Sequence, residues 1–296
     1  LCPDGSVVCI GAFDGLHRGH RALVCRAVER ARALGLPAVA LGFEPLPREF
    51  FAQGTPPPRL MLPRTKVEGL ARLGVDVVGL LRFNRRFTAI TAEEFVRRVL
   101  VGRLGAREVW VGPEFRFGHR RGGDLATLQR EGAEHGFTAH EIEPVLVGGE
   151  RVSSTRIRAA LAAGDFEDAA RLIGAPYAIS GRVVRGRQLG RTLGFPTANL
   201  IPDAKIIPRP GVYAVKVRCR GRVWDGVLNV GYNPTFSQNE LSVEVHILDF
   251  SEIIYDEKIV LFFVQRLRDE ARFHSRGELH RAIERDVGQA RELLKN

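Results

Sequence analysis

The first half of the chain alternates strand patterns with helix patterns. Apolar runs of strand length lie at residues 6–13 and 38–43. Between them, residues 18–34 repeat apolar positions at helical spacing and end at Gly35. Strands that alternate with helices predict a parallel α/β sheet with helices on both faces. We expect further strands at residues 75–83, 108–112 and 137–142, and further helices at residues 64–73, 92–100, 125–135, 154–163 and 166–173.

The pattern changes near residues 174–176, which read Gly-Ala-Pro. Beyond them, short strands of alternating polarity are separated by glycine and proline turns, a pattern typical of an antiparallel barrel. A final helix is expected at residues 278–294. The sequence therefore predicts two domains, residues 1–174 and residues 175–296. The strands expected in the second domain are residues 178–185, 212–219, 223–230, 242–249 and 259–264.

Glycines and histidines gather where the first strand leads into the first helix. Residues 11–20 read Gly-Ala-Phe-Asp-Gly-Leu-His-Arg-Gly-His. Ligands bind at the carboxyl ends of strands in an open parallel sheet, and a helix start offers free N–H groups to phosphate. His17 and His20 share one face of a helical turn and could donate hydrogen bonds to phosphate oxygens. Two unrelated histidines are the alternative, but their position after the first strand favours a phosphate site.

A second candidate loop precedes the barrel strands. Residues 190–200 read Gly-Arg-Thr-Leu-Gly-Phe-Pro-Thr-Ala-Asn-Leu. Glycines let the backbone approach a ligand closely, and a hydroxyl at Thr197 with a carboxamide at Asn199 suits Mg²⁺ and nucleotide phosphates. An ordinary turn with a capping threonine and asparagine is the alternative on composition alone.

Glu244 lies in a segment that reads as a strand with one buried face. Residues 241–249 alternate apolar and polar positions, which predicts a strand with one buried face. Glu244 and His246 then share the opposite face. On the pattern alone, Glu244 could equally be an ordinary glutamate on a solvent-facing strand.

The chain is strongly basic, with a net charge of +10 and a pI near 10.1. Such a charge fits either a nucleic-acid binder or an enzyme that takes anionic nucleotides. The basic residues are spread along the chain and interleaved with acidic ones, which favours the enzyme and no nucleic-acid partner. No apolar run approaches ~18 residues, so we expect no membrane-spanning helix and no membrane partner.

The four cysteines are Cys2, Cys9, Cys25 and Cys219. None has Cys-x-x-Cys spacing, so we expect neither a zinc site nor a redox pair. Cys9 and Cys25 lie in apolar patterns and are predicted to be reduced core residues. Together with an N-terminal stretch that does not resemble a signal peptide, this predicts a cytoplasmic location.

Motifs in both halves resemble those of the bacterial bifunctional riboflavin kinase/FAD synthetases. Residues 11–20 are similar to the His-x-Gly-His signature of nucleotidyltransferases, and residues 153–158 are similar to a second signature of the same module. Residues 181–200, 226–236 and 244–250 resemble the riboflavin kinase module. The resemblance extends over nearly the whole chain, with the motifs in the family's order.

The resemblance implies a fold and two reactions. Residues 1–174 would form a Rossmann-like FAD synthetase (FMN adenylyltransferase) domain, and residues 175–296 a Greek-key β-barrel kinase domain with a C-terminal helix. The kinase would phosphorylate riboflavin to FMN with ATP and Mg²⁺. The FMN phosphate would then attack the α-phosphorus of a second ATP to give FAD and pyrophosphate, without a covalent enzyme intermediate. Riboflavin, FMN and ATP are the implied small-molecule partners.

The resemblance also assigns roles to single residues. His17, His20 and Glu244 are the implied catalytic residues, with Glu244 as the general base of the kinase. ATP for adenylyl transfer is implied at Gly11, Phe13, His17, His20, Ser154, Thr155 and Arg158. ATP and Mg²⁺ for the kinase are implied at Gly186, Gly190, Thr197 and Asn199, with Thr197 and Asn199 as metal ligands. Flavin binding is implied at Asn229, Arg272 and Phe273.

Two positions depart from the family's pattern. The family usually has Asp or Asn where this chain has Glu114, and often a polar residue, commonly His, where this chain has Leu46. These departures motivate an alternative hypothesis, a riboflavin kinase whose nucleotidyltransferase domain is weakened or repurposed.

Overall fold

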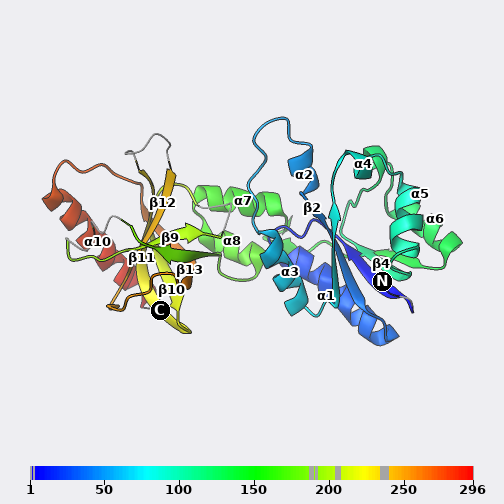
Figure 1. Cartoon of the computed structure of the whole chain (residues 1–296), viewed down its shortest axis with the longest axis horizontal. Helices are drawn as coiled ribbons and strands as arrows, with labels where there is room; N and C mark the ends of the chain where they lie inside the picture. The colour runs from blue at the N-terminus through cyan, green and yellow to red at the C-terminus, as the bar shows by residue number, and fades with distance from the viewer. Residues whose placement is uncertain are drawn as a thin grey trace. The chain divides into compact units, whose positions relative to one another are not determined.

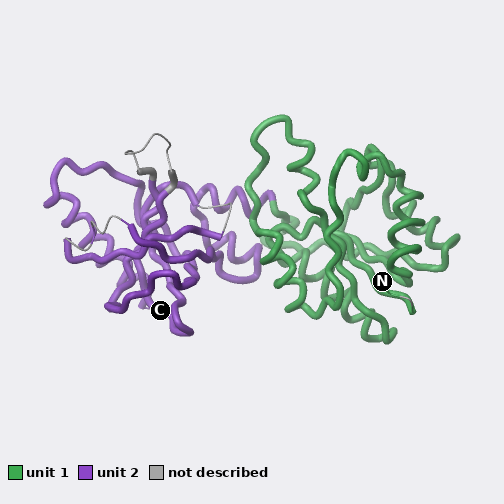
Figure 2. Tube along the Cα trace, in the orientation of Figure 1, with its two compact units in different colours: residues 1–154 green, residues 155–296 purple. Residues whose placement is uncertain are grey.

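The computed structural model describes residues 2, 4–186, 190, 193–203, 208–233 and 240–295. The chain divides into two compact units, residues 1–154 and residues 155–296 (Figure 2).

The first unit is built on a parallel sheet of five strands in the order β3-β2-β1-β4-β5. Its strands are β1 Ser6–Ile10, β2 Ala38–Glu44, β3 Val77–Arg82, β4 Ala106–Val111 and β5 Thr138–Glu141, and β6 Leu146–Val147 and β7 Glu150–Arg151 form a separate hairpin. Its helices are α1 Arg18–Leu34, α2 Pro47–Phe50, α3 Pro63–Arg72, α4 Arg85–Thr88, α5 Ala92–Phe95 and α6 Leu125–His135, with a π-helical turn η1 Val96–Val101 and a 3₁₀ turn η2 His119–Arg121.

Helices cover both faces of this sheet (Figure 1). Alternate residues of β1 point to opposite faces, as the strand period requires. Val7 and Cys9 pack in a core with α1 and α3, whereas Val8 and Ile10 pack in a second core with α5, η1 and α6. The prediction of a parallel α/β sheet with two covered faces is confirmed.

The second unit contains a closed antiparallel barrel in the order β10-β11-β12-β9-β8-β13. Its strands are β8 Ala178–Val184, β9 Ala198–Pro202, β10 Gly211–Cys219, β11 Arg222–Asn233, β12 Glu240–Ile247 and β13 Lys258–Arg268. Its helices are α7 Ser154–Ala163, which starts at the last residue of the first unit, α8 Phe166–Ile173 and α10 Arg276–Leu294. The predicted barrel with a C-terminal helix is confirmed.

Helices pack on two parts of the barrel wall. Ala290 and Leu294 of α10 join a core with Val212 and Val227 of β10 and β11 (Figure 1). Phe166 of α8 stacks on an aromatic group that includes Tyr177, Tyr213 and Phe263. The barrel therefore has two apolar supports that hold its strands in place.

The structure differs from the expected elements at several points. β1 ends at Ile10 rather than residue 13, because glycine follows and Phe13 takes a left-handed φ of 48°. β9 lies where a loop was expected, and α2 lies between residues 43 and 64, where no element was expected. Cys9 is buried as predicted, but the prediction for Cys25 was wrong, because its side chain is exposed on α1.

Among the described residues, no helix has the length and apolar content needed to cross a membrane.

Candidate active sites

The loop between β1 and α1 holds the two predicted catalytic histidines together. His17 is the N-cap of α1, and its Nδ1 accepts a hydrogen bond from the backbone N–H of His20 at 3.2 Å. The two rings stack with their centroids 3.7 Å apart, and the edge of Phe13 meets His20 at 5.5 Å. Because Nδ1 of His17 accepts, the neutral ring carries its proton on Nε2.

Burial keeps both imidazoles uncharged near neutral pH. It lowers the pKa of His17 to about 4, although the nearby Asp14 carboxylate acts in the opposite direction. Burial also lowers the pKa of His20 well below its usual range, and His17 and Lys66 lower it further. Both rings therefore offer N–H donors without adding formal charge. The buried Nδ1 of His20 has no hydrogen-bond partner among the described residues.

A cavity of about 270 Å³ opens beside these histidines at the carboxyl end of β1. Gly11, His17, His20 and Ser154 all line it. Four of the residues predicted to bind ATP therefore share one hollow. Phe13 is buried beneath it in the core that contains α1. Thr155 and Arg158 follow Ser154 in α7 and fall in the second unit, so their role in ATP binding remains a prediction.

A larger cavity of about 660 Å³ lies in the same unit and has an aromatic lining. Ser154 lines both cavities, so the two hollows are neighbours at this residue. Asp14 and Arg48 also line the larger one. A largely apolar cavity with a few polar groups is typical of a site for a planar organic ligand. Its aromatic side chains are Phe43, Phe51, Phe83, Phe87, Phe95 and Phe117.

Asp14 organises the wall of the larger cavity, and the sequence analysis assigned it no role. It is 1% exposed. Its carboxylate accepts the backbone N–H groups of Leu60 and Met61 at 3.0 and 3.1 Å and pairs with Arg48 at 2.6 Å. Its backbone carbonyl accepts the Ser154 hydroxyl at 2.8 Å. Asp14 thus joins the β1–α1 loop to segments far away in sequence, a contact that no local pattern reveals.

Two further buried cations support this region. Lys66 of α3 is fully buried, and its Nζ donates to the carbonyl of Ala12 at 2.9 Å. Burial lowers the pKa of Lys66, while Asp14 acts to raise it. Arg59 binds Glu44 at the end of β2 at 2.5 Å and also binds Glu49 of α2. Lysine and arginine at these positions look like ordinary surface residues in sequence.

The two residues that depart from the family's pattern have clear structural roles. Leu46 is 1% exposed and lines the 660 Å³ cavity. Glu114 pairs with Arg151 at 2.8 Å, and Arg151 lines the smaller cavity. Leu46 therefore contributes an apolar side chain to the wall of the larger cavity. Glu114 pairs with an arginine that lines the smaller cavity.

In the barrel, Glu244 lies at the centre of the second candidate site. Its Cα pairs with those of Asn229 on β11 and Asn199 on β9. The Glu244 carboxylate accepts hydrogen bonds from the hydroxyls of Ser242 at 2.9 Å and Thr197 at 3.4 Å. The structure therefore brings Thr197, Asn199, Asn229 and Glu244 onto neighbouring strands and the loop that enters them.

The two predicted loop glycines lie against the same residues. A Cβ at Gly186 would lie 2.2 Å from the Asn199 side chain. A Cβ at Gly190 would lie 2.3 Å from the carbonyl oxygen of Phe195 and 3.4 Å from Thr197 Oγ1. Both positions need the absence of a side chain, because the chain folds closely around Thr197 and Asn199.

Arg272 and Phe273 lie on the segment between β13 and α10. There the Arg268 guanidinium stacks on the Phe273 ring at 5.6 Å, and Arg268 also pairs with Asp286 of α10 at 2.7 Å. The described contacts do not join either residue to Glu244, so their role in flavin binding remains a prediction.

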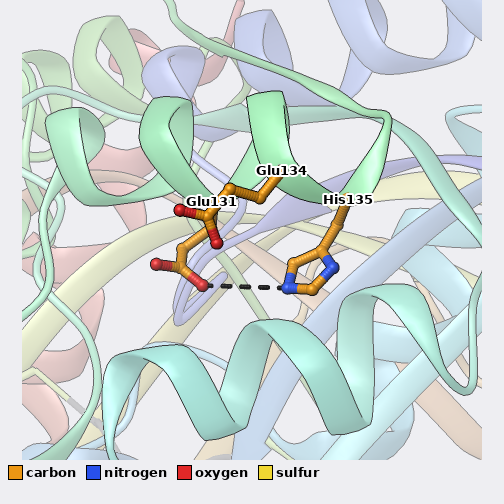
Figure 3. A group of neighbouring side chains, drawn as sticks. All are labelled: Glu131, Glu134 and His135. Atoms are coloured by element: carbon orange, nitrogen blue, oxygen red, sulfur yellow. Dashed lines mark ion pairs between the residues drawn. The ribbon is translucent and has the colours of Figure 1, made fainter.

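One cluster could be mistaken for a metal site. Glu131, Glu134 and His135 of α6 have ligand atoms within 4.8 Å of one another (Figure 3). The Glu131 carboxylate already pairs with Arg130 at 3.1 Å and with His135 at 3.9 Å. Glu134 and His135 follow Glu131 by three and four residues on one helix, and this spacing alone brings the three side chains together.

The fold and the two sites define a two-module transferase, in which an α/β unit precedes an antiparallel barrel. Residues 2–156 match the family model described as FAD synthetase, and residues 173–294 match the one described as riboflavin kinase. The chain belongs to the family of bifunctional riboflavin kinase/FMN adenylyltransferases.

Curated relatives with that name cover almost all of the chain. The protein of Pseudomonas fluorescens is 46% identical over 290 residues, which are 98% of this chain and 93% of the relative. That of Escherichia coli K12 is 44% identical over 292 residues, with the same coverage, and that of Haemophilus influenzae is 40% identical over 294 residues, 99% of this chain and 96% of the relative. The presence of both modules supports the two-activity hypothesis rather than the weakened-domain alternative.

A solved structure is similar throughout. It is described as a macrolide-efflux protein from Streptococcus pneumoniae, and it is 32% identical with a TM-score of 0.88, covering 98% of this chain and 94% of that one. The likeness extends to both modules of the fold.

Proposed function

We propose that the barrel phosphorylates the 5′-hydroxyl of riboflavin with ATP, and that the α/β unit adenylylates the FMN product with a second ATP. The observation that carries this proposal is the pair of separate polar sites. One contains stacked neutral histidines beside a cavity at the end of β1, and the other contains a carboxylate beside Thr197 and Asn199.

Glu244 is the proposed general base of the kinase step. Its carboxylate takes the proton of the riboflavin 5′-hydroxyl while the oxygen attacks the γ-phosphorus of ATP, and ADP leaves. Hydrogen bonds from Ser242 and Thr197 fix the orientation of the carboxylate. A positioned base of this kind contributes about 10²–10⁴-fold to the rate.

Thr197 and Asn199 are the proposed ligands of Mg²⁺. The hydroxyl, amide and carboxylate oxygens of Thr197, Asn199 and Glu244 are the donor types that Mg²⁺ prefers. The close approach of Gly186 to the Asn199 side chain leaves no room for a competing side chain there. When bound, the ion would neutralise charge on the transferring phosphates.

In the α/β unit, the aromatic cavity is the proposed site of the FMN ring. The phosphate of FMN would then reach the Ser154 side, where the two cavities meet. A bond forms between an FMN phosphate oxygen and the α-phosphorus of ATP, the bond to the β-phosphate breaks, and pyrophosphate leaves. His17 and His20 donate hydrogen bonds to phosphate oxygens whose charge grows in the transition state.

The remaining assignments belong to the same proposal. Thr155 and Arg158 would bind ATP phosphates, and Asn229, Arg272 and Phe273 would contact the flavin of the kinase step. The functional boundary is placed between residues 174 and 175, and the family models leave residues 157–172 between their matches. The free state of Cys2, Cys9, Cys25 and Cys219 supports a reducing compartment, the cytoplasm, as the place of action.

Product analysis tests the two steps separately. Purified protein is incubated with riboflavin and Mg-ATP, or with FMN and Mg-ATP, and the flavins are separated by chromatography. We expect FMN followed by FAD in the first reaction and FAD with pyrophosphate in the second. Absence of FAD from the FMN reaction would favour a weakened α/β unit, and absence of both products would overturn the proposal.

A further inference from the structure

Two residues of strand β12 contact the loop that contains Thr197. Glu244 and His246 lie two residues apart and therefore on the same face of the strand. Glu244 accepts the Thr197 hydroxyl, and Nδ1 of His246 lies 2.8 Å from the carbonyl oxygen of Pro196. The contact of His246 is the shorter of the two and acts on the peptide group just before Thr197.

The same loop segment is fixed from other directions. The Phe195 ring meets His246 edge-on at 5.6 Å and meets His280 of α10 at 5.3 Å. The backbone N–H of Phe195 donates to the carbonyl of Gly190 at 2.9 Å. Phe195 is thus partly buried among β12, α10 and its own turn, so the residue just before Pro196 is held by contacts from several directions.

The hydrogen bond defines the state of the His246 ring. A carbonyl oxygen can only accept, so Nδ1 must carry a proton, and in the neutral ring Nε2 is then the acceptor. Nδ1 of His246 therefore anchors the loop through the Pro196 carbonyl and does not serve in proton transfer.

We propose that His246 is a positioning residue of the kinase reaction, which sets the place of the Thr197 hydroxyl relative to the Glu244 carboxylate. This inference rests on the proposed function of the barrel. Without the bond, the Pro196 carbonyl loses its partner, and the loop is held beside Glu244 by the 3.4 Å contact of Thr197. Small displacements of groups that orient phosphates cost large factors in rate.

Two substitutions at His246 separate anchoring from proton transfer. In His246→Asn the amide nitrogen can take the place of Nδ1 and donate to Pro196, but the amide acts as neither an acid nor a base near neutral pH. In His246→Leu the donor is lost. Kinase kcat and KM for Mg-ATP and for riboflavin are measured on the full chain, and FAD formation from FMN in the same samples reports on the folding of the first unit.

For His246→Leu we expect kcat/KM for Mg-ATP to fall by about 10–100-fold. His246→Asn should remain within about fivefold of the original protein, a rescue consistent with a positional role. FAD formation from FMN should stay within about twofold in both variants. His280→Leu is the matched control, because it removes an imidazole that contacts Phe195 without bonding to the loop backbone, and its effect should be the smallest.

Three results would overturn the inference. His246→Asn could be as impaired as His246→Leu, which would indicate proton transfer by the ring. His246→Leu could retain full kinase activity. His280→Leu could be as damaging as His246→Leu, which would assign the effect to ring packing. Failure of the unsubstituted protein to form FMN would instead reject the proposed function of the barrel. In a Trp110→Phe background, the Trp224 fluorescence melting curve of each variant shows whether the barrel is folded.

Discussion

At the scale of single residues, His17 combines a structural and a chemical role. One ring nitrogen caps α1, and the ring lines the cavity at the end of β1. His17 is 6% exposed, so its charged form is disfavoured in the folded protein. This gives the stability of the first unit a defined dependence on pH.

We expect the first unit to lose stability as the pH falls from 6.5 to about 4. The pKa of His17 is lowered by folding, so the unfolded chain binds the proton first and is favoured by acid. The loss in the free energy of unfolding amounts to roughly 3 kcal/mol for the full shift in the pKa of His17. Urea unfolding of a Trp224→Phe protein, followed by Trp110 fluorescence, measures it at several pH values.

His17→Asn is the matched comparison for that pH series. Asparagine is a good N-cap but does not titrate, so the stability curve should become flatter between pH 6.5 and 4. An unchanged slope would show that His17 is not responsible for the dependence.

The two glycines of the kinase loop give a second test at this scale. Gly186→Ala should displace the Asn199 side chain, and Gly190→Ala should collide with the carbonyl of Phe195. We expect each to lower kcat/KM for riboflavin phosphorylation by at least about tenfold. Gly288→Ala on α10 is the control, because a Cβ there meets nothing within 4 Å. Equal kinase activity in all three variants would contradict the close packing of this loop.

At the scale of elements, local patterns located the longer helices and most of the strands. The stretch from Gly11 to His20 could be recognised because its chemistry is contiguous in sequence. β9 could not, because it follows a glycine- and proline-rich loop and its register with β12 covers only Ala198 and Asn199. This strand therefore forms because of its pairing in the folded barrel, and no local pattern predicts it.

Long-range polar contacts could not be predicted from the sequence for the same reason. Asp14 is held by Arg48 and by the backbone of Leu60 and Met61, and nothing local indicates those partners. The sites are predictable where one motif supplies the residues, and unpredictable where folding brings them together.

Arg59 provides the test at this scale, because it ties the end of β2 to α2. Arg59→Met should destabilise the first unit by about 3–5 kcal/mol, since Glu44 and Glu49 lose their buried partner. It should also raise KM for FMN, because α2 contributes to the wall of the aromatic cavity. The exposed Arg64, which pairs with Glu68, offers the control Arg64→Met, which should change stability by less than about 1 kcal/mol. Equal stability losses for the two variants would rule out this role for Arg59.

At the scale of the whole molecule, each unit has its own hydrophobic core and one of the two tryptophans. Trp110 lies in β4 of the first unit and Trp224 in β11 of the second. Each unit can therefore be followed separately in proteins that retain a single tryptophan.

We expect core substitutions to act within their own unit. Leu100→Ala should destabilise the transition reported by Trp110 by about 2–5 kcal/mol and leave the Trp224 transition nearly unchanged, because Leu100 is buried in the core that η1 forms with α5 and α6 in the first unit. Leu261→Ala, in the barrel, should do the reverse. Equal shifts of both transitions by either variant would show that the units unfold as one.

The central claim is that one chain carries two independent sites for ATP chemistry. The most direct measurement is the flavin product profile of His20→Ala and Glu244→Ala, each supplied with Mg-ATP and either riboflavin or FMN. His20→Ala should form FMN and stop there, with FAD formation reduced by about 10²-fold or more. Glu244→Ala should convert FMN to FAD but should leave riboflavin almost unreacted. Loss of both activities in either folded variant would contradict the account.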